Sequence, residues 1–524
     1  MRSPRKLCRQ VLSVVTAMAA FSCVPAFAQQ LNGYWVLRVP NGDGTFRSTY
    51  MVLKQTGEAL SGTLLGFGPH GLPLAGTLQG NRIQLKVVLG VSDPVAPPPG
   101  KPRRQILLGG LYEHGKLDLH TQDFHGNARQ CIAERTTEEA TEPPPRLPLP
   151  ALRELPDNGL AQTPPMGWNS WNKFEGQVDD AKVRAMADAM VSSGMARLGY
   201  VYVNIDDTWQ GTRDAQGNII PNRKFPDMKA LSAYVHAKGL KLGIYSSPGP
   251  QTCAGYEGSY GHELQDARTY ASWGVDYLKY DLCSAGRIYS RQPEELRALY
   301  QKMGAALQSA GRPVVYSLCE YGDGDPWKWG AKTGGNLWRT TGDIQDNWAS
   351  MEKIGFSQIA ISSYTRPGHW NDPDMLEVGN GGMTAEEYRT HMSLWSMLAA
   401  PLLAGNDLRF MNGMTKSILM NADVIAIDQD RLARPVELVS DNGTVTVLTR
   451  PLTGNAIAVG LFNRGGTPAE MSFAWSRIRG MLGKPHAISA RDLWQHAPVA
   501  IQGDRFVAQV PAHGVVLLRV AAMP

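Results

Sequence analysis

A repeated alternation of short apolar runs and helical segments over residues 161–430 restricts the possible folds more than any other feature of this chain. A glycine usually precedes the next apolar run, as Gly199 precedes "YVYVNIDD" and Gly239 precedes "LKLGIYSS". Eight such runs, from "MGWNSW" to "APLLAGNDL", fall within roughly 250 residues, the length of a (β/α)8 barrel. A doubly wound sheet would need a glycine-rich phosphate loop after its first strand, and no such loop follows there. We therefore predict a central (β/α)8 barrel over residues 161–430.

Helical periodicity and end signals mark several of the connections in this repeat. Residues 179–194 place apolar side chains on one stripe and end in a glycine. A second helix is predicted from about Met228 to Lys238, a third within "HELQDARTYASWG", and a fourth that begins at Pro293, a residue favoured at the first helical position. The apolar stripe of the first helix consists of Val183, Met186, Ala187, Met190 and Val191.

Two β domains are predicted to flank the barrel. Residues 29–136 carry short alternating runs separated by glycine and asparagine turns, which predicts about eight antiparallel strands in a sandwich or a small barrel. The proline-rich stretch 137–160 is expected to be an extended spacer. Helical patterns disappear after about Gln429, and residues 431–524 are predicted to form a terminal antiparallel β-sandwich.

Residues 1–28 are typical of a secretory signal peptide. A basic start is followed by the apolar run "VLSVVTAMAAFSCV" and by "PAFA", with small residues three and one before Gln29. We therefore expect export to the periplasm or the cell exterior, and no later segment has the apolar length of a membrane span. The formal charge of +5 falls to 48 − 47 = +1 without this segment, which gives no basis for nucleic-acid binding.

Polar residues gather at the ends of the predicted barrel strands, where the active sites of such barrels lie. Carboxylates and cations in a ring, flanked by tryptophans, suit a small polyhydroxylated ligand, because charged groups bind hydroxyls and indole faces cover the apolar side of a sugar. These residues are Trp168, Trp171, Asp206, Asp207, Tyr245, Lys279, Asp281, Cys319, Glu320, Arg339, Asp343, Asp372 and Asp374.

Two of the carboxylates are predicted to carry out the reaction. Lys279 and Asp281 project to the same side of a strand, and a nearby positive charge is expected to keep Asp281 ionised as a nucleophile. Asp343, if partly desolvated, would retain a proton for a leaving oxygen. From this chemistry alone, the reverse assignment of the two roles remains open.

The motifs "MGWNSWNKF", "NIDDTW", "TCAGYEGSYGHE", "WGVDYLKYD", "WRTTGDI" and "WNDPDMLEVGN" resemble those of the melibiase-type α-galactosidases of glycoside hydrolase family 27. The resemblance runs from about Leu160 to Gln429, continues loosely into the last domain and does not cover the first 150 residues. It implies a retaining hydrolase that releases terminal α-linked galactose from oligosaccharides or polysaccharides through a covalent glycosyl-enzyme. No cofactor and no metal are expected.

The resemblance also assigns roles residue by residue. Asp281 would be the nucleophile and Asp343 the acid/base. Glu320, where the N-acetylgalactosaminidase branch has a small residue, favours a free 2-hydroxyl, and Cys253 would form a disulfide with Cys283. The sugar would contact Asp206 and Asp207 through its 4- and 6-hydroxyls, Arg339 and Asp374 near its 2-hydroxyl, and Trp171, Tyr245 and Lys279 elsewhere in the pocket.

Departures from the family pattern and rival interpretations remain. Thr208 replaces a frequent cysteine, Tyr321 and Asp323 replace residues near the 2-substituent and the outer subsite, and Ser247 replaces an aspartate. Within the family, α-N-acetylgalactosaminidase and β-L-arabinopyranosidase activities are the alternatives, and outside it a non-catalytic glycan-binding protein. A metal-dependent hydrolase would use His262, His369, Asp372 and Asp374. The N-terminal aromatics either bind glycan or pack in a core; they are Tyr34, Trp35 and Phe67. The natural substrate and the oligomeric state are left open.

Overall fold

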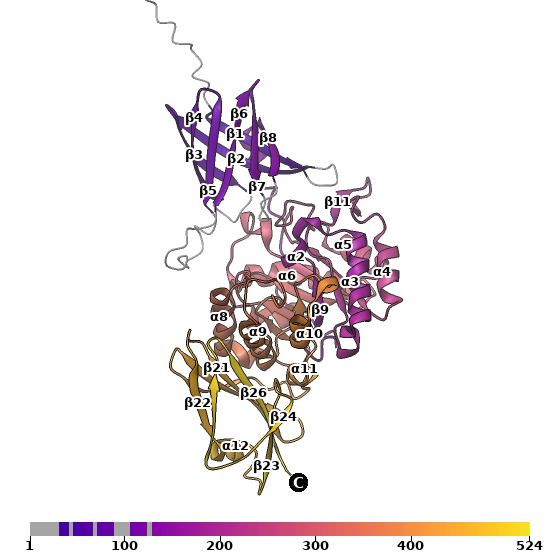
Figure 1. The fold of residues 1–524 in the computed structure, drawn as a ribbon. Coiled ribbons are helices and arrows are strands. Elements are labelled where there is room, and N and C mark those ends of the chain that lie inside the picture. The colour runs from indigo at the N-terminus through magenta and orange to yellow at the C-terminus, as the bar shows by residue number, and fades with distance from the viewer. Residues whose placement is uncertain (1–30, 41–45, 66–70, 89–104, 123–127, 524) are drawn as a thin grey trace, which may run out of the picture.

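The computed structural model describes residues 31–40, 46–65, 71–88, 105–122 and 128–523. The predicted signal peptide and Phe67 lie outside these residues. Figure 1 shows three successive parts, with the N-terminal strands at one end, a mixed α/β part in the middle and the C-terminal strands at the other end.

The N-terminal part is a closed antiparallel barrel of eight strands in sequential order, which settles the choice between sandwich and barrel. β1 closes the barrel by pairing with both β2 and β8. Trp35 lies in its core, fully buried, and its indole donates to the Leu31 carbonyl at 3.0 Å, so core packing accounts for this side chain. The strands are β1 (Gly33–Pro40), β2 (Phe46–Thr56), β3 (Ala59–Leu65), β4 (Leu72–Gln79), β5 (Arg82–Val88), β6 (Gln105–Glu113), β7 (Lys116–Gln122) and β8 (Ala128–Arg135).

The central part contains an eight-stranded parallel sheet in which all eight predicted runs form strands. Its order is β17-β16-β15-β14-β13-β10-β9-β18, so neighbours in the sheet follow one another along the chain except at β18, which pairs with the first strand β9. Beyond β17, Leu376 forms a parallel bridge with Ala404 of β18. The strands are β9 (Met166–Asn169), β10 (Tyr202–Asn204), β13 (Lys241–Ser246), β14 (Tyr277–Asp281), β15 (Val315–Cys319), β16 (Leu337–Arg339), β17 (Trp370–Asp372) and β18 (Leu402–Ala404).

Helices connect these strands, and sequence signals mark the ends of several of them, although α4 ends at His236, two residues before the predicted Lys238. The Asp179 side chain accepts from the Lys182 amide at the start of α3, and Gly194 ends that helix with a φ of 92°. Pro293 opens α6 as expected. The longer helices are α3 (Asp180–Ser193), α4 (Met228–His236), α5 (Glu263–Trp273), α6 (Pro293–Ser309), α8 (Trp348–Ser357), α9 (Ala385–Leu398), α10 (Gly413–Leu419) and α11 (Ala422–Asp428).

Shorter elements occupy the connections between the strands and the longer helices. They are the helices α2 (Trp171–Phe174) and α7 (Pro326–Trp329), the 3-10 turns η1 (Glu175–Gln177), η2 (Met195–Leu198), η3 (Cys283–Arg287), η4 (Gly330–Thr333), η5 (Gln358–Tyr364) and η6 (Leu408–Phe410), and the hairpin of β11 (Gln210–Arg213) with β12 (Ile219–Pro221). None of the helices in the described residues has the length and apolar character needed to cross a bilayer.

The proline-rich stretch is bound along the central part. It begins with the short helix α1 (Glu138–Thr141) and then runs without regular structure. The buried Gln301 of α6 accepts from the Arg153 amide at 2.8 Å and donates to the Ala151 carbonyl at 2.8 Å. The Tyr260 hydroxyl also donates to the Pro145 carbonyl at 2.7 Å. Prolines remove backbone donors, and side chains of the central part bond the groups that remain.

The C-terminal part is an antiparallel sandwich of a six-stranded and a two-stranded sheet. The prediction that helices disappear after Gln429 is wrong at α12 (Trp475–Met481), which directly follows a strand. Trp475 and Ile478 are buried three residues apart, a helical spacing that the run of strands around them conceals. The strands are β19 (Glu437–Asp441), β20 (Val445–Leu452), β21 (Ala456–Asn463), β22 (Ala469–Ala474), β23 (Ile488–Asp492), β24 (Ala497–Val499), β25 (Arg505–Val510) and β26 (Val515–Ala522).

Candidate active site

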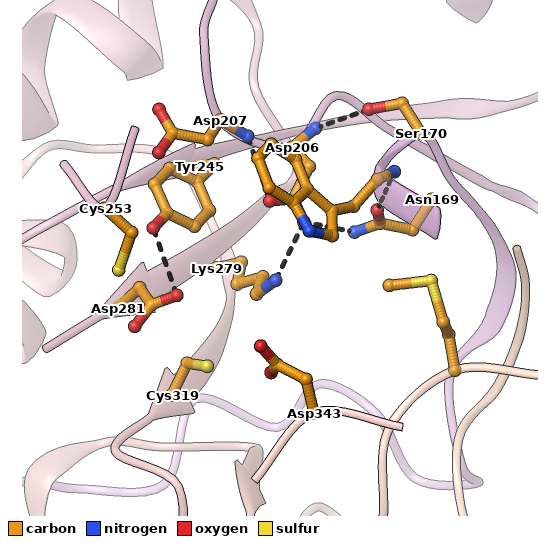
Figure 2. A network of polar contacts seen from close by, with 12 residues as sticks. Asn169, Ser170, Asp206, Asp207, Tyr245, Cys253, Lys279, Asp281, Cys319 and Asp343 are labelled. Atoms are coloured by element: carbon orange, nitrogen blue, oxygen red, sulfur yellow. Dashed lines mark hydrogen bonds and ion pairs between the residues drawn. The ribbon is translucent and has the colours of Figure 1, made fainter. Parts of the chain in front are cut away.

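The C-terminal ends of the parallel strands bring most of the predicted polar residues together. In Figure 2 the carboxylates of Asp281 and Asp343 point into a common space, with the Lys279 side chain beside it. Asp281 ends β14, and Asp343 follows β16, two strands away in the sheet. Parallel strands all end at one edge of their sheet, which is why residues so distant in sequence meet here.

Asp281 is buried and is held by two phenols. The Tyr245 hydroxyl donates to its Oδ2 at 3.0 Å, and the Tyr321 hydroxyl donates to its Oδ1 at 2.6 Å. Only 5% of Asp281 is exposed, and this burial raises the pKa of its carboxyl to about 6, although Lys279 and the Tyr321 hydrogen bond act to lower it. Both carboxylate oxygens are therefore fixed in position by neutral donors.

Lys279 forms its ion pair with Asp206. Its ammonium lies 2.8 Å from Asp206 Oδ2, which also accepts from the Asn169 side chain at 2.8 Å. The sequence predicted a nearby positive charge for Asp281, and the direct ion-pair partner of that charge is Asp206. The lysine still lowers the pKa of Asp281 through space, but a closer carboxylate from the end of β10 takes the contact.

Asp207 is buried among backbone amides. Its Oδ1 accepts from the Thr208 amide at 2.6 Å and its Oδ2 from the Ala254 amide at 2.8 Å. Burial raises the pKa of Asp207 to about 7, although these amides act to lower it. Thr208 has a φ of 82°, a left-handed conformation that turns the chain sharply after the aspartate pair.

Arg339 joins Asp343 to Asp374. Its guanidinium lies 2.9 Å from an oxygen of each carboxylate, and Asp374 Oδ2 also accepts from the Ile344 amide at 2.9 Å. Asp374 itself has a φ of 87°, so this turn, like the one at Thr208, places a strained residue in the site. The two contacts fix the segment that carries Asp343.

The electrostatic distinction between the two candidate carboxylates is the reverse of the expected one. Desolvation acts to raise the pKa of Asp343, but Arg339 and Lys279 outweigh it and hold that pKa below its usual value. The Asp343 side chain is 68% exposed, whereas Asp281 is buried. The sequence reveals the charge of Lys279 but not the burial of Asp281, and burial has the larger effect on the pKa of Asp281.

Cys253 and Cys283 form the disulfide that the resemblance implies, with a sulfur–sulfur distance of 2.06 Å. The bridge lies against both phenols, since Tyr245 Oη is 3.0 Å from Cys283 Sγ and Tyr321 Oη is 3.4 Å from Cys253 Sγ. Among the described cysteines, Cys131 and Cys319 are buried and form no disulfide. Figure 2 places Cys319 near Asp281, to which it is the register partner on β15.

Glu320 lies near Arg339 and Asp281 and interacts with both through space. It is fully buried, and within the described residues neither carboxylate oxygen has a hydrogen-bond partner. Burial raises the pKa of Glu320 well above its usual range. Trp171, in contrast, is half-buried at the start of α2, where its amide donates to Asn169 Oδ1 at 2.9 Å.

Tyr321 is the site residue that the sequence argument treated only as a departure from the family pattern. The signal that could have found it is the local sequence "CEYGDGD", in which glycines allow the chain to turn back after β15. The phenol reaches Asp281 because Tyr321 has a φ of 62°.

The two histidines of the metal-hydrolase alternative have other partners. His369 contacts the Gly335 carbonyl at 2.9 Å through Nδ1 and Asp157 at 3.4 Å through Nε2, and His262 Nδ1 contacts Gln265 at 3.2 Å. In the described part of the chain, the one group with metal-ligand proximity is Cys253, Asp281 and Cys283, whose sulfurs are bonded to each other and are therefore not thiolate ligands.

Comparison with known proteins places this arrangement in a family. The family model described as "Alpha galactosidase A" matches residues 163–430, and the one described as "Alpha galactosidase C-terminal beta sandwich domain" matches residues 442–520. The α-galactosidase of Cyamopsis tetragonoloba is 50% identical over 365 residues, which cover 69% of this chain and 87% of that protein.

Two further relatives agree. The α-galactosidase A of Cellvibrio japonicus is 46% identical over 383 residues, covering 69% of this chain and 93% of that protein. The crystal structure of α-galactosidase I from Mortierella vinacea aligns with a TM-score of 0.67 at 40% identity and covers 70% of this chain and 99% of that one. The chain therefore belongs to glycoside hydrolase family 27, the family of the melibiase-type α-galactosidases.

Proposed function

We propose that this protein is a retaining exo-glycosidase that hydrolyses terminal non-reducing α-D-galactosyl residues of oligosaccharides or polysaccharides. The observation that carries the proposal is the pairing of a buried and an exposed carboxylate, Asp281 and Asp343, within one polar site of a family 27 chain. The names of the relatives, which are α-galactosidases, support galactose as the sugar.

In the first step, Asp281 acts as the nucleophile. One of its oxygens forms a bond to the anomeric carbon while the bond from that carbon to the leaving oxygen breaks. The proton of Asp343 passes to the leaving oxygen, so that the aglycone departs as an alcohol. The product is a galactosyl ester of Asp281 with inverted configuration.

In the second step, Asp343 acts as a base. Its carboxylate takes a proton from water as the water oxygen bonds to the anomeric carbon and the ester bond breaks. This second inversion restores the original configuration and returns the Asp281 carboxylate and the protonated Asp343. Neither step requires a cofactor or a metal.

The productive state needs one proton on the pair, and it must lie on Asp343. In the free protein the pKa order favours the proton on Asp281. A sugar that covers the exposed Asp343 would remove its water and raise its pKa, because desolvation disfavours the charged form. We therefore propose that substrate binding shifts the shared proton toward Asp343.

The remaining polar residues would position the sugar. Asp206 and Asp207 would bind the 4- and 6-hydroxyls, and Arg339 and Asp374 would lie near the 2-hydroxyl. Glu320 contributes less to this proposal than its sequence position indicated, because its carboxylate is buried. Further sugar contacts are assigned to Trp171, Tyr245 and Lys279.

We propose three further features. The parallel bridge between Leu376 and Ala404 supports closure of the sheet into a (β/α)8 barrel. The division into residues 29–136, 137–160, 161–430 and 431–524 is supported by the change in strand pairing between these segments. Export to the periplasm or the cell exterior rests on the sequence of residues 1–28.

The test compares hydrolysis of p-nitrophenyl α-D-galactoside, α-N-acetylgalactosaminide and β-L-arabinopyranoside by the whole protein. We expect the galactoside to have the highest kcat/KM, and Asp281→Ala to abolish its hydrolysis. A higher kcat/KM for either of the other two glycosides would show that galactose is not the preferred sugar. Unchanged activity in Asp281→Ala would overturn the mechanism.

A further inference from the structure

We propose that Tyr321 is a positioning residue that fixes the Asp281 carboxylate for attack, so that the phenol controls when this carboxylate is charged. The inference rests on the proposed function for its catalytic meaning. Its structural content, a hydrogen bond that favours the ionised form of Asp281, can be tested without turnover.

The contact is direct and short. The Tyr321 hydroxyl lies 2.6 Å from Asp281 Oδ1, within the range of a hydrogen bond to an ionised carboxylate. Tyr245 donates to the other oxygen at 3.0 Å, so the two phenols together leave the carboxylate no freedom to rotate. Burial and the neighbouring Asp281 raise the pKa of Tyr321 well above its usual value, and the phenol therefore remains a neutral donor.

The loop that carries Tyr321 is strained, which supports a functional role. Tyr321, Gly322, Gly324 and Asp325 all have positive φ values, of 62°, 88°, 70° and 56°. A Cβ on Gly322 would lie 2.3 Å from the Thr340 carbonyl oxygen, so a glycine is needed there. Non-glycine residues hold such conformations only where their surroundings determine them, and these residues cluster at functional sites.

The disulfide contacts the Tyr321 phenol and supports its position. Cys253 Sγ lies 3.4 Å from Tyr321 Oη, while the sulfur of Cys283 lies 3.0 Å from Tyr245 Oη. The bridge joins the loop after β13 to the turn after β14 and keeps both phenols against Asp281. Tyr321 is thus positioned by its own loop after β15, by Asp281 at the end of β14 and by the disulfide.

Several charged or titratable groups face Asp281, and the phenol acts in addition to them. Lys279 lowers the pKa of Asp281, as does the Tyr321 hydrogen bond, whereas Asp343 and Asp206 raise it. Removal of the Tyr321 hydroxyl would therefore raise the pKa of Asp281 further, because one of the interactions that opposes the effect of burial would be lost. The groups that interact with Asp281 are Asp206 after β10, Tyr245 on β13, Lys279 on β14, Tyr300 on α6, Cys319 at the end of β15, Glu320 and Tyr321 directly after it, and Asp343 after β16.

The first test is the pH profile of Tyr321→Phe, measured as kcat/KM on an oligosaccharide that ends in the sugar the wild type prefers, because its leaving oxygen, unlike p-nitrophenolate, needs the proton of Asp343. We expect the alkaline limb to move up by about one pH unit and the maximum to fall about tenfold, because the shared proton then favours Asp281 over Asp343 by that factor. Tyr260→Phe removes a phenol that bonds the linker and should leave the profile unchanged. If the alkaline limb of the kcat/KM profile of Tyr321→Phe lies at the same pH as that of the wild type, the inference is overturned.

The second test needs no substrate. The Tm deficit of Tyr321→Phe should be larger at pH 7, where Asp281 is ionised, than at pH 4.5, where it is protonated, because a hydrogen bond to a charged acceptor is the stronger one. In an Asp281→Asn background this pH dependence should disappear. A deficit that is equal at both pH values would overturn the inference, whereas a wild type inactive on every glycoside would overturn only the proposed function.

Discussion

Lys279 and Asp281 project from the same side of β14, yet the ammonium of Lys279 lies 2.8 Å from Asp206, a residue from another strand. The side chain of Asp206 is 2% exposed, so this ion pair is almost free of water. A buried carboxylate without a partner costs free energy, and Lys279 therefore stabilises the folded site by pairing with Asp206.

Replacing Lys279 by Met should destabilise the protein by about 3–5 kcal/mol, because Asp206 is then left buried without its cation. Denaturant unfolding measures the change. Lys279→Met combined with Asp206→Asn removes both charges and should recover part of the loss. If the single variant is as stable as the wild type, the ion pair is not needed for folding.

The rate should depend on pH through the pair Asp281 and Asp343. Asp281 has a pKa of about 6, and Asp343 a pKa below its usual value. Above pH 6 the pair loses its last proton and the acid is missing, so kcat/KM should fall on the alkaline side from about pH 6. Full activity at pH 8 would contradict a shared proton on this pair.

Asp343→Ala should affect substrates according to their leaving groups. Natural galactosides need a proton on the departing oxygen and should lose about 10²–10⁴-fold in kcat/KM, the usual contribution of a general acid. p-Nitrophenolate leaves without a proton, so the first step with that substrate should lose much less. Burst kinetics separate the two steps, and equal losses with both kinds of substrate would argue against Asp343 as the acid.

Removing the disulfide should cost both stability and activity. Cys253 and Cys283 are 30 residues apart, a loop for which the chain-entropy model gives about 3–4 kcal/mol. Cys253→Ala with Cys283→Ala should lower Tm and weaken the support of Tyr245 and Tyr321. The matched control is Cys131→Ala, a buried cysteine of the N-terminal barrel that forms no disulfide, and this change should leave kcat/KM unchanged.

Gln301→Ala should release the linker from α6. The side chain makes two hydrogen bonds to linker backbone at 2.8 Å, and their loss should cost about 1–3 kcal/mol because buried polar groups are left without partners. Limited proteolysis should then cut within residues 142–158 faster than in the wild type. Gln308→Ala, which loses one exposed bond to Pro156, serves as the milder comparison.

The order of elements was predictable because it depends on local periodicity. Each of the eight parallel strands lies at a predicted run, and the ends of α3 and α6 follow from Gly194 and Pro293. These signals act within a few residues, and the parallel sheet preserves their sequence order. The contacts of the linker could not be predicted, because its partners, such as Gln301 and Tyr260, are more than 100 residues away in the chain.

The electrostatics of the site were not predictable in the same way. The sequence shows that Lys279 is two residues from Asp281, but not that Asp206 is closer in space or that Asp281 is 5% exposed. Burial and tertiary distance set a pKa, and neither can be read from spacing along one strand. The hydrogen bond from Tyr321 likewise depends on its left-handed backbone angle, which the glycines of "CEYGDGD" allow but do not specify.

The hydrophobic interior crosses one domain boundary but not the other. Phe462 and Leu517 of the C-terminal sandwich belong to the same buried cluster as Trp395 and Leu402 of the central part, whereas the N-terminal barrel has a cluster of its own. A chain cut near residue 430 would expose an apolar surface and should aggregate, while removal of the N-terminal barrel should leave a protein that still dissolves. The C-terminal sandwich has a second cluster of its own, around Val459 and Phe473, so one of its faces is shared with the central part and another is not.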